Sequence, residues 1–305
     1  MTTPLLDRIP YCPWPGRPRL RWPNDARVAF WVIPNVEYYE FLPAERFGRS
    51  GLPTPDIPSY AERDYGNRVG FWRMLDVLDR HHIRPTVNIN LAVLEYFPEI
   101  REAMLERDWD FCFHGVYNTQ PEPRGLSEAD ERAYYQRIIE MFHRLTGRRM
   151  SGLNVLSRAT APLPDLIAEL GFLYSADYLH DDQPTPIAVR SGKLVSVPYS
   201  LEINDAIFTL FQRPWEGPEF LQAAKDQFDR LYQDGAQQGT VMCLVLHPWM
   251  IGYPHRIGYL DQILEYVLGH DGVWAATAKD IAEYYLAHYY DAMLAHLARG
   301  NGGAR

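Results

Sequence analysis

Short apolar runs alternate with helical segments along almost the whole chain, and this alternation limits the possible folds more than any other feature. The runs predict strands at residues 26–35, 85–93, 109–114, 152–156, 172–178, 194–203, 240–248 and 273–277. Helices are predicted between them, at 68–82, 98–108, 127–146, 163–171, 218–234, 257–268 and 279–298. Because strands that alternate with helices favour a parallel sheet, we predict an α/β fold, a single distorted (β/α) barrel of about seven strands.

No linker or change in composition divides residues 26–298, which we therefore treat as a single barrel domain. Residues 1–25 are rich in Pro and Arg and are predicted to form an extended N-terminal arm. Residues 299–305 are predicted to be a disordered tail. Residues 36–65 are predicted to be a long loop, and loops of that length inside a compact domain usually carry function.

The charge pattern argues against several classes of partner. The net charge is −9 and the basic residues are scattered, so we expect neither nucleic acid nor an anionic membrane surface as a partner. No stretch is apolar enough for a signal peptide or a membrane span. Cys12, Cys112 and Cys243 form no CxxC pair. The sequence therefore predicts a reduced, cytoplasmic protein.

Polar residues of three kinds stand at the ends of predicted strands. The first strand leads to Asn35 and Glu37, the third to His114, and the late strand at 240–248 contains His247. A lone histidine after an apolar run is often structural. A carboxylate and two imidazoles at the same end of a parallel barrel, where catalytic groups gather, instead predict a shared site.

Other polar or aromatic residues are weaker candidates for the walls of this site. They follow predicted strands or precede predicted helices: Asp64, Arg68, Asp181, Asp182, Glu202, Asn204, Asp205 and Trp249.

Several common motifs are absent from the sequence. It has no G-x-G-x-x-G after the first strand, no G-x-x-x-x-G-K-[ST] and no G-x-S-x-G. Two of the three cysteines lie inside predicted strands, which are poor places for a reactive thiolate. A carboxylate with histidines remains, and this set suits the activation of water for hydrolysis.

The order of several stretches resembles that of a known superfamily. These stretches are RWPNDARVAFWVIPNVE, RDYGNRVGFWRMLDVLDRHHIRPTVNIN, FCFHGVYNT, LIAELGFLYSADYLHDDQP, SVPYSLEIND, LHPWMIGYPHRI and GVWAATAKDIAEYY. Together they resemble the polysaccharide deacetylase superfamily of nodulation-type deacetylases. The resemblance is closest to its branch of deacetylase-like allantoinases and cyclic imide hydrolases. It implies a distorted (β/α) barrel that hydrolyses carbon–nitrogen bonds other than peptide bonds.

The sequence departs from the deacetylase pattern at its metal motifs. Deacetylases carry an Asp-rich first motif that supplies a base and a metal ligand, whereas the matching positions here are Asn35 and Glu37. Their second motif is His-x-x-x-His, with both imidazoles on the metal, whereas this chain has His114 and Asn118. Their arginine–proline motif is absent around residues 152–158. Their C-terminal histidine, the general acid, matches His247.

The resemblance suggests roles for these residues. Glu37 is expected to activate water and His247 to protonate the leaving nitrogen, while His114 and Asn118 polarise the carbonyl or hold a metal. Because an Asn amide is a poor zinc donor, we expect either no cofactor or a weakly bound divalent metal on Glu37, His114 and Asn118.

The remaining predictions concern ligands and assembly. The predicted substrate is a small amide, imide or ureide, and its binding residues are expected to be Asn35, Asp64, Arg68, Asn118, Asp181, Asp182 and Trp249. Two alternatives stay open, namely a metal-dependent N-deacetylase of an acetylated sugar and a catalytically silent ligand-binding barrel. An aromatic stripe on the last helix, at Tyr284, Ala287, His288, Asp291, Leu294 and Ala295, predicts a homo-oligomer.

Overall fold

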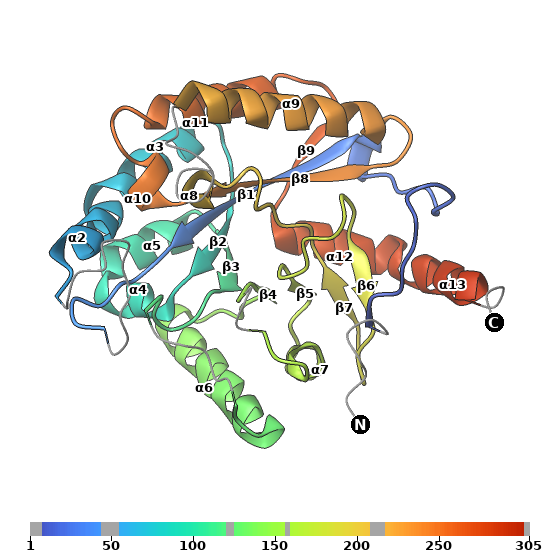
Figure 1. Ribbon diagram of the computed structural model, residues 1–305, viewed down its shortest axis with the longest axis horizontal. Coiled ribbons are helices and arrows are strands. Elements are labelled where there is room, and N and C mark those ends of the chain that lie inside the picture. The colour runs from blue at the N-terminus through green and yellow to red at the C-terminus, as the bar shows by residue number, and fades with distance from the viewer. Residues whose placement is uncertain (1–7, 44–54, 120–124, 156–158, 208–216, 302–305) are drawn as a thin grey trace.

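A computed structural model of the chain describes residues 8–43, 55–119, 125–155, 159–207 and 217–301. These residues form one sheet surrounded by helices (Figure 1). The strands are β1 (Val28–Val36), β2 (Thr86–Ile89), β3 (Asp110–Phe113), β4 (Gly152–Leu153), β5 (Tyr174–Ser175), β6 (Thr185–Ile187), β7 (Leu194–Ser196), β8 (Thr240–Leu246) and β9 (Val273–Ala275).

The helices occupy the segments between the strands. They are the 3-10 helix η1 (Pro23–Asp25), α2 (Ile57–Tyr65), the π-helix η2 (Gly66–Gly70), α3 (Phe71–Arg80), α4 (Leu91–Tyr96), α5 (Pro98–Glu106), α6 (Glu128–Thr146), α7 (Leu163–Glu169), α8 (Asp205–Ile207), α9 (Gly217–Gly235), α10 (Pro248–Ile251), α11 (Ile257–Leu268), α12 (Ala278–His288) and α13 (Tyr290–Asn301).

The sheet has the order β6-β7-β5-β4-β3-β2-β1-β8, with β9 paired to β1. Every pairing is parallel except that of β6 with β7. A parallel bridge between Asn204 and Val245 joins the chain after β7 to β8, the other end of the sheet. The predicted distorted (β/α) barrel is thereby confirmed, with nine strands in the described residues instead of about seven.

Side chains alternate between two cores along the strands. On β1, Ala29, Trp31 and Ile33 belong to an inner cluster that also contains residues of β3, β5, β7 and β8. Val28, Phe30 and Val32 belong to an outer cluster with the surrounding helices. Because side chains on a strand alternate between its two faces, the inner face of β1 continues through Asn35 to Glu37. The helix α9 lies along the outer face of β8, and α11 lies beside α9 and packs against β9 (Figure 1).

Several predicted boundaries are wrong. The strand expected at 85–93 ends at Ile89, and residues 91–96 form α4. The loop expected at 36–65 ends in α2, whose N-cap Asp56 accepts a hydrogen bond from the backbone of Ser59. The long C-terminal helix is divided into α12 and α13 at Tyr289. The short antiparallel strand β6 was not predicted.

The described part of the N-terminal arm packs on the barrel. Arg8 is buried and forms a two-point ion pair with Asp165, and the Trp22 indole donates to the carbonyl of Thr240. The predicted arm is therefore held at residues 8–25, and its residues 1–7 lie outside the described ones. Of the predicted disordered tail, residues 299–301 belong to α13 and residues 302–305 lie outside the description.

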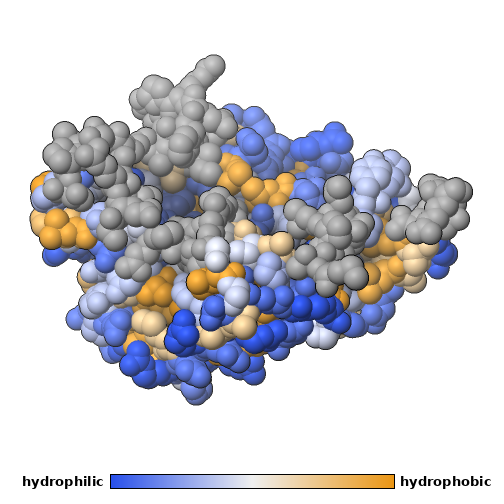
Figure 2. Space-filling view, turned by 60° about the horizontal axis from the view of Figure 1, so that its bottom comes forward, coloured by the Kyte–Doolittle hydropathy of each residue, from blue (hydrophilic) through white to orange (hydrophobic). Residues whose placement is uncertain are grey.

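The surface bears on the predicted partners. Within the described residues, no helix combines the length and the apolar character needed to cross a bilayer. On the face in Figure 2, hydrophobic residues form separate small patches among hydrophilic ones.

In the stripe expected to contact a second subunit, Tyr284 packs on Trp22 and Trp274 of its own chain, whereas Leu294 is exposed. Ala287 and His288 of α12 are exposed as well, so both helices leave part of the stripe open to such a contact, and the homo-oligomer stays a prediction.

Two glycines allow η2 to pack directly on α10. A Cβ added at Gly70 would lie 2.0 Å from the carbonyl oxygen of Pro248, and one at Gly66 would lie 2.6 Å from the backbone nitrogen of Trp249. We predict that Gly70→Ala lowers the free energy of unfolding by about 1–3 kcal/mol through overpacking. Urea unfolding measures this loss. The control is Gly258→Ala in α11, where an added Cβ meets nothing within 4 Å and should not destabilise.

Candidate active site

Three strand ends bring Glu37, His114 and His247 together. Each residue continues the inner face of its strand, two positions beyond Asn35, Cys112 and Val245 respectively. The Oε1 atom of Glu37 lies 3.6 Å from Nε2 of His114 and 3.9 Å from Nε2 of His247. All three side chains are largely buried. Both imidazoles therefore point their Nε2 atoms at one carboxylate oxygen.

The other oxygen of Glu37 accepts two hydrogen bonds. The Tyr39 hydroxyl donates to Oε2 over 2.7 Å and the Trp249 indole over 2.9 Å. Burial alone would raise the pKa of Glu37. The nearby His114 ring, whose Nε2 lies 3.6 Å from Oε1, the charge of His247 and the hydrogen bond from the Tyr39 hydroxyl outweigh burial and lower this pKa to about 2. Glu37 is thus an ionised carboxylate in the resting site at neutral pH.

Asp205 orients the His247 ring. Its carboxylate is fully buried and accepts from Nδ1 of His247 over 2.7 Å and from the His247 backbone N–H over 2.9 Å. Burial lowers the pKa of His247, but the charges of Asp205 and Glu37 and the Asp205 hydrogen bond raise it above its ordinary value. His247 is therefore a histidine that keeps its proton to higher pH than usual, with Nε2–H directed at Glu37.

His114 is oriented by a backbone carbonyl. Its Nδ1 lies 2.7 Å from the carbonyl oxygen of Asn154, which can only accept, so this nitrogen carries a hydrogen. If no further proton were present, three acceptors would face one another, namely Nε2 of His114, Nε2 of His247 and Oε1 of Glu37. At least one proton must therefore lie among them, and the raised pKa of His247 makes this residue its natural carrier.

A layer of asparagines lies below this group. Nδ2 of Asn88 donates to Oδ1 of Asn35 over 2.7 Å and to Oδ1 of Asn154 over 3.1 Å. Nδ2 of Asn35 donates to the carbonyl of Leu246. Asn35 was predicted to bind substrate, but it is 1% exposed and its hydrogen bonds join neighbouring strands. It forms part of the floor of the site.

Asn118 lies beside Tyr39, and its environment bears on the predicted metal. Its Nδ2 atom donates to the Tyr39 hydroxyl over 2.5 Å, so the amide contributes to a hydrogen-bond chain that ends at Glu37. Among the described residues, no three His, Cys, Asp or Glu side chains are grouped so that they could hold a metal ion. The expected set of Glu37, His114 and Asn118 contains only two good zinc ligands and does not fit a stable zinc site.

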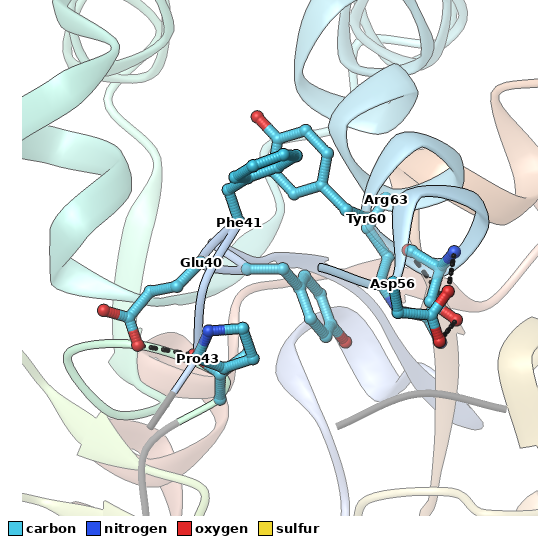
Figure 3. A pocket seen from close by; sticks show the side chains of 9 residues that line it. Glu40, Phe41, Pro43, Asp56, Tyr60 and Arg63 are labelled. Carbon is cyan, nitrogen blue, oxygen red and sulfur yellow. Dashed lines mark hydrogen bonds between the residues drawn. The ribbon is translucent and has the colours of Figure 1, made fainter. Parts of the chain in front are cut away.

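A small pocket adjoins the site. Figure 3 shows it between the segment after β1, which contributes Phe41 and Pro43, and α2, which contributes Tyr60 and Arg63. Its volume of about 20 Å³ holds about one water molecule. Tyr39 also lines it, and the guanidinium of Arg63 lies 5.0 Å from the Tyr39 ring and 4.8 Å from the Trp249 ring. Arg63 thus packs against both donors to Glu37.

Two predicted binding residues, Asp181 and Asp182, lie elsewhere, and two others, Asp64 and Arg68, pair with each other near the surface. Arg68 is 70% exposed and pairs with Asp64 one helical turn away. Asp181 forms a two-point ion pair with Arg17 of the N-terminal arm. The Asp182 carbonyl accepts from the backbone of Val241, near the start of β8. Since Val241 precedes His247 by six residues of extended chain, Asp182 lies about 20 Å from His247. Asp181 and Asp182 were misplaced because they follow a strand in sequence but return to the opposite end of the barrel.

Several residues of the site were not predicted. Tyr39 stands two positions after Glu37, so the strand alternation was a usable signal for it. Asp205 was only one of several weak candidates. Arg63, Asn67 and Asn154 act through tertiary contacts; for example, Nδ2 of Asn67 donates to the backbone carbonyl of Glu37 over 2.8 Å. No local sequence pattern marks such contacts.

The His247–Asp205 contact gives a testable titration. We predict that the pKa of His247 lies above 6.5 and that Asp205→Asn lowers it, because the amide keeps an acceptor oxygen but loses the charge. The stabilisation from this pair is then complete below pH 6.5 and is lost as the pH rises through the raised pKa. NMR titration of the ring measures both values. Asp226→Asn on the exposed face of α9 is the control, and an unchanged His247 pKa in Asp205→Asn would contradict the assignment.

Comparisons with known proteins identify solved structures and a curated protein that are similar to this chain. No family model matches the chain. The crystal structure of a "probable Polysaccharide deacetylase" from Pseudomonas aeruginosa PAO1 is 30% identical, covers 89% of this chain and 95% of its own, and gives a TM-score of 0.78. The crystal structure of Puue allantoinase is 28% identical, covers 90% and 95%, and gives a TM-score of 0.80.

A curated protein of Schizosaccharomyces pombe named "Putative polysaccharide deacetylase" is 28% identical over 308 residues, which span 89% of this chain and 94% of that protein. The resemblance inferred from the sequence is thus confirmed, with an allantoinase among the structures most similar to this chain. The chain belongs to the polysaccharide deacetylase superfamily of hydrolases, which act on carbon–nitrogen bonds other than peptide bonds.

Proposed function

We propose that the chain hydrolyses a carbon–nitrogen bond of a small amide, cyclic imide or ureide. The observation that carries the proposal is the convergence of two oriented imidazoles on Oε1 of one ionised carboxylate. A base, an acid and a further polar group within hydrogen-bond reach of one point are what hydrolysis of a carbonyl–nitrogen bond requires.

Two features support a small substrate over a polysaccharide. The Puue allantoinase structure aligns with 90% of this chain, and an allantoinase is an enzyme of a small ureide. The metal set that deacetylases use is replaced here by residues that do not form a stable zinc site.

The reaction follows from the hydrogen bonds. A water held at Oε1 of Glu37 attacks the carbonyl carbon and gives its proton to Glu37. His247 donates its Nε2 proton to the leaving nitrogen, and the carbon–nitrogen bond breaks to give a carboxylic acid and an N–H group, which belongs to an amine, an amide or a ureido group according to the substrate. Nε2 of His114 is an acceptor, because its ring hydrogen on Nδ1 is donated to Asn154, so His114 is placed to orient the attacking water. Return of the proton from Glu37 to His247 restores the resting site, across the 3.9 Å between Oε1 and Nε2.

The low pKa of Glu37 is compatible with this cycle. A carboxylate with a pKa of about 2 is a weak base in the resting site. Part of this depression comes from the positive charge of His247. As His247 passes its proton to the leaving nitrogen, this contribution disappears and Glu37 becomes a stronger base. Acid and base steps therefore assist each other.

The test is a substrate screen with hydantoins, succinimide-like imides, allantoin and N-acetylated sugars. We expect ring opening or amide cleavage, read as acid or ammonia release. Glu37→Gln and His247→Gln should each lower kcat by about 100-fold or more, the usual contribution of general acid–base catalysis. Acetate release from N-acetylated sugars would instead favour a sugar deacetylase. No turnover of any compound, or an active His247→Gln variant, would contradict the proposal.

Metal dependence has a separate test. We predict that activity survives dialysis against a strong chelator with no metal left by elemental analysis, because Asn118 is not a zinc ligand. If activity falls and zinc, cobalt or manganese restores it, Glu37 and His114 serve as metal ligands and this prediction is wrong.

A further inference from the structure

The direction of the hydrogen bonds around Tyr39 is fixed by its neighbours. The Asn118 amide nitrogen can only donate, so the Tyr39 oxygen is its acceptor at 2.5 Å. A phenol has a single hydrogen, which is then directed to Oε2 of Glu37 over 2.7 Å. If the Asn118 amide were flipped, its oxygen would compete for this hydrogen. The Tyr39 oxygen would then face an ionised carboxylate without a proton between them.

The two carboxylate oxygens of Glu37 have different partners. Oε2 accepts from Tyr39 and from Trp249, and the Arg63 guanidinium packs over the rings of both donors. Oε1 is the atom that faces Nε2 of His114 and Nε2 of His247. The position and the chemistry of Oε1 therefore depend on what holds Oε2.

We propose that Asn118 and Tyr39 are positioning residues that act on the reaction only through Glu37. In this inference, which rests on the proposed function, Asn118 orients the Tyr39 hydroxyl and Tyr39 fixes Oε2, so that Oε1 is the oxygen that handles the attacking water. The sequence position that is a metal ligand in deacetylases is here the first member of a hydrogen-bond chain to the base. Asn118 is then not a contact for the substrate carbonyl.

A double-mutant cycle tests this chain of action. Asn118→Leu removes the donor at nearly constant shape, and Tyr39→Phe removes the hydroxyl. Each should lower kcat by about 10-fold with little change in KM, since a hydrogen bond to a charged group is weakened or lost. In the Tyr39→Phe background, Asn118→Leu should cost nothing more, because its acceptor is already gone. Tyr117→Phe, in the residue next to Asn118, is the matched control and should leave both constants unchanged.

Two kinetic results would overturn the proposal. A rise in KM at constant kcat in Asn118→Leu would mean that Asn118 contacts the substrate directly. Multiplicative losses in the double variant would mean that Asn118 and Tyr39 act independently.

A spectroscopic experiment distinguishes a failure of this inference from a failure of the proposed function. With tyrosine labelled by carbon-13 at Cζ, the Tyr39 signal should move in Asn118→Leu and in Glu37→Gln, and should stay in place in Tyr117→Phe. This readout needs no substrate, so it decides the hydrogen-bond chain even if none of the screened compounds is hydrolysed. An unmoved Tyr39 signal in Asn118→Leu would show that the chain of bonds does not exist.

Discussion

The buried charge of Glu37 is the interaction on which the rest of the site depends. An ionised carboxylate at 6% exposure is costly unless hydrogen bonds and opposite charges offset its loss of water. Its two hydrogen-bond donors come from the segment after β1 and from α10, and the imidazoles that face it follow β3 and β8. Because these elements are distant in sequence, the charge stabilises one particular docking of them. Removal of a single donor should therefore change the site more than the fold.

The backbone around the site is arranged to hold these donors. The indole of Trp249 reaches Glu37 because α10 lies directly against η2, where Gly66 and Gly70 leave no side chain between the two backbones. Asp205 of α8 fixes both the backbone and the ring of His247. The site is therefore built as much by close backbone packing and by buried acceptors as by the strand ends themselves.

Sequence patterns predicted those parts of the molecule that follow from the alternation of apolar and polar residues along a strand or a helix. The alternation along β1, β3 and β8 was enough to place Glu37, His114 and His247 at one end of the barrel, and α11 was predicted at its observed limits. The patterns did not predict the position of residues that depends on how the chain turns after a strand. Asp181 and Asp182 follow a strand, but the chain then turns back toward the start of β8. Arg63 and Asn154 gain their roles from neighbours far along the chain, which no local period encodes.

The balance of charge in the site also bears on what it can bind. Glu37 and Asp205 both face His247, whose raised pKa favours the charged ring. Arg63, which packs over the Tyr39 and Trp249 rings, forms its own ion pair with Glu62. A site whose charges are already paired gains little from a charged ligand, because a new ion would compete with existing partners. A neutral, polar ligand such as an amide, imide or ureide adds hydrogen bonds without that competition. Charge develops only when water adds to its carbonyl, and it develops beside groups that are already oriented, which is the condition for stabilising a transition state more than a ground state.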